Sequence, residues 1–551
     1  MHQPEYRDLR SGEYHQPWTY LHTIKDYVDM VAHLENNSQA RAVVNFAPVL
    51  LEQIDDYAKQ LDDYLNHAKV LRDPLLAVLA DPVLFMDEER RLFIIKSCRK
   101  ANKQRLVDRF EVFKNLIEMS EDALENRDKL SYYSEQFFVD LIVWYHLAWT
   151  AETVRRTDRR IKNLMEKARN FTIRDRHLLV ELYCEMIGGV IKRYRTLAEE
   201  GRIELSATPY AHPIMPLLID IKSASQAMPD IDLPLAEKYP DGFERSRWHI
   251  KKGMQVFRHY FGQAPAGCWP SEGSISTETI ELVSEMGIKW LASGETVLRN
   301  SLHSNAELAD ECIHKAYQFK NTDSVCFFRD DGLSDMIGFS YSDWHADDAV
   351  ANLVNHLEEI ARNCADKPDS IVSIILDGEN AWEYYPENGY HFISALYEKL
   401  GSHKGLKLTT YSEFLDLHHH KHILQDVVAG SWVYGTFSTW IGEKDKNRAW
   451  DILIEAKNSY DRVISQNVLT QEEKDQAEMQ LATCESSDWF WWFGEHNSAE
   501  SVKSFDMQFR MHISNLYQLL KIEPPEYLGR AFSFGSGDPD KGGAMLPGKQ
   551  Y

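Results

Sequence analysis

Two acidic residues stand in short motifs that could place them on either side of one bond. Asp377 ends the apolar run SIVSIILDG at 370–378, and residues at the carboxyl ends of strands face the active site in parallel barrels. Glu272 lies in GCWPSEG at 267–273, where a proline and a glycine fix the loop around it. Glycoside hydrolysis requires two such carboxyl groups, one to attack or stabilise the anomeric carbon and one to protonate the leaving oxygen. The pair therefore indicates a glycosidase.

Each acid alone also has an ordinary structural explanation. An Asp after a strand often forms a turn or caps a helix, and a Glu is favoured near a helix N-terminus. Only the combination points to catalysis, because different strands of one barrel converge on the same face. The sequence contains no Walker, GxGxxG, HExxH or GxSxG motif, so nucleotide binding, zinc proteolysis and serine hydrolysis lack support.

Two further acids suggest ligand binding. Glu204 lies within the short strand motif RIELSA at 202–207. A buried carboxylate without a partner is costly, so a cavity-facing position is favoured over a structural salt bridge. Asp488 is followed directly by a run of aromatic residues. This arrangement suits a sugar subsite, where the carboxylate binds hydroxyl groups and the rings stack on the apolar faces, although a plug in the core is the alternative.

Six short β-branched or aromatic runs are expected to form the strands that position these acids. They alternate with long amphipathic helical stretches, which is typical of parallel βα units. The runs are 42–48, 202–207, 287–293, 324–330, 370–378 and 407–414. A helical insertion at about 50–200 separates the first two and is expected to form one wall of a cleft.

The chain is expected to have three parts. Residues 1–415 would form an α/β barrel domain, and residues 416–528 a C-terminal helical domain that completes the cleft. Helices with interspersed aromatic loops mark the second part. Residues 529–551 are rich in Gly and Pro and are expected to be a flexible tail.

The composition excludes several classes of function. The 551 residues include 61 Lys and Arg against 85 Asp and Glu, a formal net charge of −24, which disfavours nucleic acid and membranes as partners. The seven cysteines are scattered without a CxxC pair, so we expect a reducing compartment and neither a disulfide framework nor a zinc site. The sequence has no apolar stretch of membrane-spanning length and no signal-peptide pattern, and we expect a cytoplasmic protein. The histidine-rich run at 418–422 could bind metal adventitiously, although an exposed linker is favoured.

Five motifs, taken in order, resemble the five conserved regions of glycoside hydrolase family 57. They are HQPEY at 2–6, GRIELS at 201–206, GCWPSEG at 267–273, ILDGENAWEYYP at 375–386 and CESSDWFWW at 484–492. Further stretches between them are similar as well, so the resemblance covers essentially residues 2–528.

This resemblance implies a fold and a set of site residues. The fold would be an incomplete seven-stranded β/α barrel followed by a helical domain. Glu272 would be the nucleophile and Asp377 the general acid/base of a reaction that retains the anomeric configuration of an α-glucan. The residues expected to bind substrate are His2, Glu204, Trp269, Trp382, Trp432, Asp488 and Trp489. No metal or other cofactor is implied for the chemistry.

The activity expected from the resemblance is hydrolysis of α-glucosidic bonds in starch, glycogen or maltooligosaccharides. The WPSEG form of the third region is more similar to amylopullulanase and maltogenic-amylase members than to branching enzymes. Glucan transfer or branching remains an alternative, because it depends on whether water or a sugar is the acceptor. A glucan-binding protein that has lost catalysis is a further alternative.

His2 raises a separate question about the N-terminus. In the family, the HQP motif terminates the first barrel strand, which here would lie upstream of Met1. We therefore expect the natural chain to begin several residues earlier, and His2 to lie at the cavity beside an unfilled strand position. The second HQP, at 15–17, is expected to be incidental.

Overall fold

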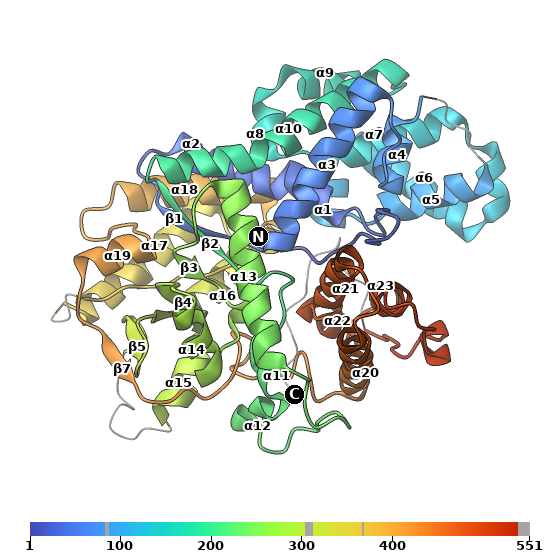
Figure 1. Ribbon diagram of the computed structural model, residues 1–551. Coiled ribbons are helices and arrows are strands. Elements are labelled where there is room, and N and C mark those ends of the chain that lie inside the picture. Colours follow the sequence, from blue (N-terminus) through green and yellow to red (C-terminus); the bar gives the residue numbers. More distant parts are fainter. Residues whose placement is uncertain (83–86, 304–311, 366–368, 538–551) are drawn as a thin grey trace.

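A seven-stranded, mostly parallel sheet forms the centre of the molecule. The structure is a computed structural model that describes residues 1–82, 87–303, 312–365 and 369–537 (Figure 1). Every neighbouring pair of strands is parallel except β5 and β6. The α/β fold class and the seven-stranded sheet expected from the sequence are confirmed. The strands, in spatial order, are β1 (Ala42–Phe46), β2 (Ile203–Ala207), β3 (Gly267–Cys268), β4 (Trp290–Gly294), β6 (Val325–Arg329), β5 (Tyr317–Phe319) and β7 (His422–Leu424).

Four of the six predicted strands are present. The runs at 42–48, 202–207, 287–293 and 324–330 coincide with β1, β2, β4 and β6. The sequence reasoning missed β3, β5 and β7. Each of these strands has only two or three residues, too few to show the alternation that reveals a strand.

The predictions of strands at 370–378 and 407–414 are wrong. In the first run only Ser373 forms a bridge, to Arg329 at the end of β6. The other side of this segment faces a cavity and pairs with no strand of the described residues. In the second run the side chain of Thr410 accepts a hydrogen bond from the N–H of Glu413 and begins helix α19 (Tyr411–Leu417). A helix cap therefore prevails over the β-branched pattern there.

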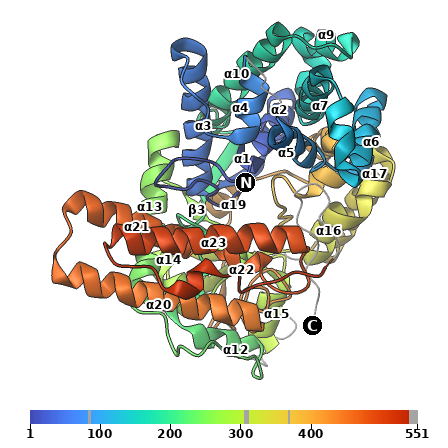
Figure 2. The same cartoon turned by 90° about the vertical axis from the view of Figure 1, so that its right-hand side faces the viewer.

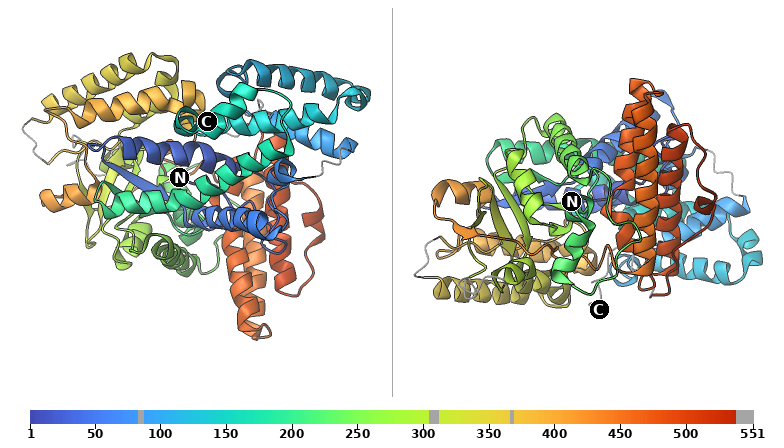
Figure 3. Two further views of the ribbon diagram at one scale, coloured as in Figure 1. Left: turned by 90° about the horizontal axis from the view of Figure 1, so that it is seen from above. Right: turned by 60° about the horizontal axis from the view of Figure 1, so that its bottom comes forward.

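The predicted insertion is helical and begins directly after β1. The long helices α3 and α10 pack along each other, and the shorter ones gather at one end of the molecule (Figures 1 and 3). The insertion consists of α3 (Pro48–His67), α4 (Pro74–Ala80), α5 (Glu88–Cys98), α6 (Glu111–Glu125), α7 (Glu135–Ala148), α8 (Glu152–Thr157), α9 (Arg159–Lys167) and α10 (Ile173–Glu199).

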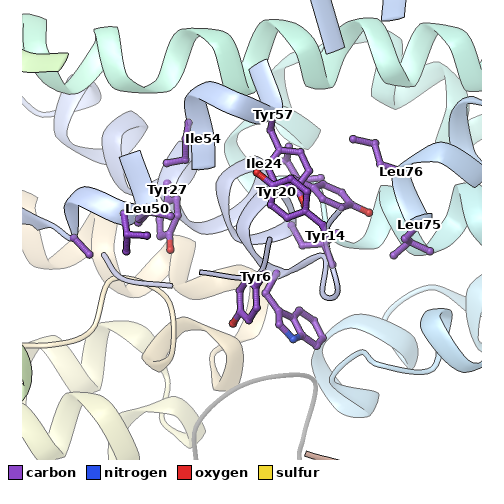
Figure 4. Close-up of a cluster of buried hydrophobic side chains, with 14 of the residues drawn as sticks. Tyr6, Tyr14, Tyr20, Ile24, Tyr27, Leu50, Ile54, Tyr57, Leu75 and Leu76 are labelled. Carbon is purple, nitrogen blue, oxygen red and sulfur yellow. The ribbon is translucent and has the colours of Figure 1, made fainter. Parts of the chain in front are cut away.

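Buried aromatic side chains fasten the N-terminal arm to this insertion (Figure 4). The arm leads into α1 (Trp18–His22) and α2 (Val28–Asn36). The rings of Tyr14 and Tyr57 lie 4.2 Å apart, and Tyr20 packs on Tyr57 at 5.4 Å. The Tyr57 hydroxyl donates to Asp73, which also caps α4. Burial raises the pKa of Asp73 to about 6, although its hydrogen bonds oppose the rise. The arm is thus held firmly enough to give the residues before it a defined place.

Other helices flank the sheet. Helices α17 and α18 pack on each other at one side of it, and α13 runs along another (Figure 1). None of the helices in the described part of the chain combines the length and the apolar character that crossing a lipid bilayer requires. The flanking helices are α13 (Gly242–Phe261), α14 (Thr277–Glu285), α15 (Glu295–His303), α16 (Asp331–Asp335), α17 (Ala346–Asn363) and α18 (Tyr390–Gly401).

The C-terminal part is helical, as predicted. Helices α20 (Lys444–Gln466), α21 (Gln471–Cys484) and α23 (Ala499–Leu519) lie side by side, with the short α22 (Ser487–Trp492) against them (Figure 2). Domain boundaries at 415/416 and 528/529 stay predictions. Most of the tail predicted at 529–551 lies outside the described residues, but the N–H groups of Ser536 and Gly537 donate to the carbonyls of Glu495 and Asn497.

One buried ion pair joins α13 to the start of α22. The Glu485 carboxylate is fully buried and accepts hydrogen bonds from Arg245 at 2.7 and 2.9 Å. It also bonds His249 at 2.8 Å and the hydroxyl of Tyr239 at 2.5 Å. Burial alone would raise the pKa of Glu485, but Arg245 and His249 hold it well below its usual range. Glu485 therefore stays ionised and fixes the α21–α22 corner against the barrel.

We predict that Glu485→Gln destabilises the fold by about 3 kcal/mol, since it leaves the buried Arg245 charge with only the partly exposed and more distant Glu478 carboxylate as an ionic partner. Thermal unfolding measures the loss. Because the pKa of Glu485 is depressed in the folded protein, its contribution to stability is present above the pKa of an unfolded carboxyl and is lost on acidification. The difference in Tm between the variant and the wild type should therefore become smaller as the pH falls. The matched control is Glu478→Gln, which removes a partly exposed carboxylate 3.4 Å from the same arginine. Equal losses in the two variants would contradict the prediction.

Candidate active site

A cavity of about 710 Å³ extends past the carboxyl ends of β1, β2 and β3. It is the place where side chains from distant parts of the chain meet. Seven of the nine residues predicted for the site line this cavity; they are His2, Trp269, Glu272, Asp377, Trp382, Trp432 and Asp488.

Glu272 is held on a strained turn directly after β3. Its backbone has φ 58° and ψ 28°, in the left-handed region that a non-glycine residue adopts at a cost of about 1 kcal/mol or more. The N–H of Gly273 donates to the carbonyl of Pro270 at 2.7 Å and closes the turn. Trp432 then binds Glu272 twice, from its backbone N–H to the Glu272 carbonyl at 3.1 Å and from its indole N–H to the carboxylate at 2.9 Å. The carboxylate is thereby fixed at the cavity wall.

The environment of Glu272 keeps a proton on its carboxyl group. Burial, and after it the charge of Asp377, raise its pKa to about 8, although His2 and the Trp432 indole oppose the rise. Glu272 is 7% exposed, which is why the loss of hydration dominates. At neutral pH the free site therefore holds a protonated Glu272.

Asp377 lines the same cavity and comes from the segment that follows residues 371–376. It is partly exposed, and its carboxylate accepts a hydrogen bond from the side-chain amide of Asn380 at 3.0 Å. The segment before it is tied to β6, where the Arg329 guanidinium donates to the carbonyl of Ile375 at 2.9 Å. The same guanidinium lies 5.2 Å from the ring centroid of Trp432. The structure thus brings the two predicted carboxyl groups together, and Arg329 contacts both of the segments that support them.

His2 and Asp488 form a second polar group at the cavity. His2 Nε2 lies 3.1 Å from the Asp488 carboxylate, which also accepts a hydrogen bond from Ser486 at 2.6 Å. The ring of His2 stacks on His212 with centroids 3.6 Å apart. Burial alone would lower the pKa of His2, but Asp488 and the other nearby carboxylates raise it. This pair joins the N-terminal arm to α22 across the cavity.

Aromatic rings supply the flat apolar walls. Trp269 and Trp432 meet edge to face at 5.2 Å, and Trp382 packs against Tyr385 at 5.6 Å. Such rings offer surfaces for the apolar faces of sugars, while carboxylates and histidines bind hydroxyl groups. Trp492 also lines the cavity.

Glu204 and Trp489 do not reach the cavity lining. The Glu204 carboxylate accepts hydrogen bonds from the Trp290 indole at 2.6 Å and from the backbone and hydroxyl of Ser412 at 2.9 and 2.7 Å. It therefore links β2 to α19. Trp489 is fully buried, and its indole donates to the carbonyl of Thr483 at 2.8 Å, inside the C-terminal helices.

Sequence reasoning missed His212 and Trp492. Trp492 follows Asp488 by four residues on α22, so both lie on one face of that helix, whereas Trp489 is turned away. Helical spacing could therefore have identified Trp492. His212 lies in a stretch after β2 broken by prolines, and nothing local distinguishes it from a turn residue.

The far end of the cavity is apolar and lies between β1 and residues 371–376. Within the described residues no strand lies between these two segments. Met1 marks this position, because its N–H group donates to Asn45 at 2.8 Å and its carbonyl accepts from Ala47 at 3.0 Å, as in a parallel ladder. His2 lies at the cavity as expected.

Three clusters have potential metal ligands within 4.8 Å of one another, among the residues described. They are His2, His212 and Asp488; His22, Asp26 and Glu383; and Cys312, His314 and Cys364. In the first, the two imidazoles stack on each other. In the second, the ammonium group of Lys25 already bonds both carboxylates. The third contains neither of the two predicted catalytic carboxyl groups, although its Cys364 also lines the cavity.

Comparison with known proteins identifies the family. The model of glycosyl hydrolase family 57 matches residues 1–428. No curated protein matches the sequence at a significant level.

Three solved structures show the same fold. A branching enzyme from Pyrococcus horikoshii has a TM-score of 0.59 and 16% identity, covering 97% of this chain and 90% of that chain. A branching enzyme from Thermococcus kodakaraensis has a TM-score of 0.58 and 14% identity, with coverages of 94% and 88%. An alpha-amylase from Thermotoga maritima has a TM-score of 0.56 and 14% identity, with coverages of 96% and 93%. Because the family model also spans well over half of the sequence, the chain belongs to glycosyl hydrolase family 57.

Proposed function

We propose that this protein cleaves α-glucosidic bonds of α-glucans with retention of configuration, with Glu272 as nucleophile and Asp377 as general acid/base. The observation that carries the proposal is the coupled carboxyl pair. Glu272 and Asp377 line one cavity, and the charge of Asp377 raises the pKa of Glu272. Two interacting carboxyl groups in an aromatic cavity fit glycosidic cleavage through a glycosyl-enzyme intermediate.

In the first step the Glu272 carboxylate forms a bond to the anomeric carbon while Asp377 gives its proton to the departing oxygen. In the second step a water molecule attacks that carbon, Asp377 takes its proton, and Glu272 leaves as a carboxylate. The family and the chemistry of the pair support this assignment. Transfer to a sugar hydroxyl in place of water would give glucan transfer or branching, as the names of two of the structural neighbours describe for those proteins.

The reactive form needs one proton on the pair, and it must lie on Asp377. In the free site burial places the proton on Glu272. A charged His2 and the Trp432 indole favour the ionised form of Glu272. Substrate binding is proposed to move the proton across the pair.

The remaining lining residues are proposed to hold the glucan. Trp269, Trp382 and Trp432 would stack on sugar rings, and the His2–Asp488 pair would bind hydroxyl groups. Glu204 and Trp489 would act only by positioning, through β2 and through α22. Residence in a reducing compartment stays a prediction, in keeping with the free thiols.

We predict that Glu272→Gln and Asp377→Asn each lower kcat by about 10³-fold or more while the fold is kept, because each removes one of the two groups that the reaction requires. Reducing-sugar release from starch, pullulan and maltooligosaccharides measures the loss, and product-length analysis separates shortening from transfer. Asp343→Asn, at an exposed carboxylate, is the control. A wild-type protein without turnover on any of these glucans would refute the proposed function.

The two roles are separated by azide rescue. With an activated α-glucoside, Asp377→Ala should regain turnover and give the α-glucosyl azide, because the glycosyl-enzyme still forms and azide attacks it. Glu272→Ala should give the β-azide, because azide then attacks the substrate directly. The opposite pairing of variants and anomers would show that the roles are exchanged.

We predict that kcat/KM falls on the alkaline side near pH 8, where the free pair loses its last proton. Trp432→Phe removes the indole donor that favours the Glu272 carboxylate, so the alkaline limb should move to higher pH. The measurement is a pH profile of kcat/KM with a maltooligosaccharide for both proteins. Trp269→Phe, which removes a lining indole that does not bond Glu272, serves as the control. An alkaline limb that stays in place in Trp432→Phe would contradict this account of the proton.

A further inference from the structure

A cluster of two thiols and one imidazole includes Cys364, which lines the same cavity as Asp377. Cys312 and His314 precede β5, and Cys364 follows the end of α17. The Sγ atoms and the imidazole nitrogen all lie within 4.8 Å of one another. Cysteine thiolates and histidine imidazoles around one point are typical ligands of a zinc site.

The separation of two of these ligand atoms fits tetrahedral zinc. Cys312 Sγ lies 3.6 Å from His314 Nδ1. Zinc bonds of about 2.3 Å to sulfur and about 2.0 Å to nitrogen, at tetrahedral angles, place the two ligand atoms roughly 3.5 Å apart. The ion would therefore enter this pair with little change in the backbone.

The second ring nitrogen of His314 is held as metal sites usually hold it. His314 Nε2 lies 2.8 Å from the Asp330 carboxylate. Asp330 is itself fixed, because it accepts from the N–H of Leu333 at 2.9 Å and donates its own N–H to the carbonyl of Ser373 at 2.8 Å. A carboxylate at one ring nitrogen selects the tautomer that leaves the other nitrogen, Nδ1, free to bind a metal.

The two thiols are also suited to binding a metal ion. Cys364 is 9% exposed and Cys312 is partly buried, and both are free. The hydrogen bond from His314 lowers the pKa of Cys312 to about 7, although burial opposes it. Asp330, together with Cys312, raises the pKa of His314 to about 10 against the effect of burial, so the metal-free cluster holds a proton that an ion would displace.

We propose that Cys312, His314 and Cys364 bind one Zn²⁺ ion, with water as the fourth ligand and Asp330 as the partner that orients His314. The role of the ion is to anchor the wall of the active-site cavity. Its ligands join α17 to the segment before β5, whose His314 carbonyl accepts the N–H of Ile371 at 3.0 Å. Residues 371–376 in turn carry Asp377.

The first test is substitution with Co²⁺. Protein freed of metal by a chelator under reducing conditions, then titrated with Co²⁺, should bind one ion per chain and show thiolate-to-cobalt charge-transfer absorption with intense tetrahedral d–d bands. Cys312→Ser and Cys364→Ser should each weaken the charge-transfer band, and the double variant should abolish it. A wild-type titration without thiolate charge transfer would overturn the proposal, whether or not the variants fold.

The second test measures zinc in the purified protein by elemental analysis. We expect about one ion per chain, a loss of that ion in the double Cys→Ser variant, and a higher Tm with zinc than without it. The control replaces His418, His419 and His420 by Ala, because that run could hold metal adventitiously. Zinc that disappears with the histidine run and survives in the double Cys variant would refute the site. A disulfide between Cys312 and Cys364 in the protein as isolated, seen as a loss of two hydrogen atoms by mass spectrometry, would refute it as well.

Discussion

The burial of the Glu272 carboxyl is the constraint on which the site depends. A carboxylate removed from water is costly unless another group stabilises its charge. Here the Trp432 indole donates a hydrogen bond to it, the nearby His2 favours its ionised form, and a bound proton otherwise neutralises it. The turn that carries it is strained and needs Trp432 close by. Gly294 permits this approach, because a Cβ atom there would lie 2.6 Å from the Trp432 Cα. Similarly, a side chain at Gly267 would collide with the Trp290 ring.

The site is assembled from three parts of the chain that have no local reason to meet. The sheet supplies Glu272, the N-terminal arm supplies His2, and α22 supplies Asp488. Each part is held by its own buried cluster, the tyrosines of Figure 4 for the arm and the Glu485–Arg245 pair for α22. Because these clusters lie outside the cavity, the site geometry depends on packing that never touches a ligand.

Features of the fold and the site could be predicted from the sequence where neighbouring residues determine them, and could not where tertiary contacts do. The turn around Glu272 could be recognised because a proline and a glycine shape it locally. Asp377 was singled out by an apolar run before it, although the strand predicted from that run does not form. Glu204 carries no such signal, since its partners, Trp290 and Ser412, are chosen by the tertiary fold. The segment at 370–378 has the residues of a strand, yet within the described chain only Ser373 forms a bridge, to Arg329, so no ladder of backbone hydrogen bonds makes it one. The cluster of Cys312, His314 and Cys364 could not be predicted from the sequence, because Cys364 meets the other two only after folding.

Arg329 has a consequence for stereochemistry. Retaining and inverting glycosidases differ chiefly in the gap between their two carboxyl groups, by a few ångströms. In this protein one planar guanidinium bonds the backbone that leads to Asp377 and lies against the indole that holds Glu272. Two further bonds, to Asp331 at 2.8 Å and to Asp335 at 2.7 Å, keep it from tilting. In the proposed reaction, the length of this side chain would therefore help to set the distance between the two carboxyl groups, and with it the handedness of the product, although Arg329 need never meet the sugar.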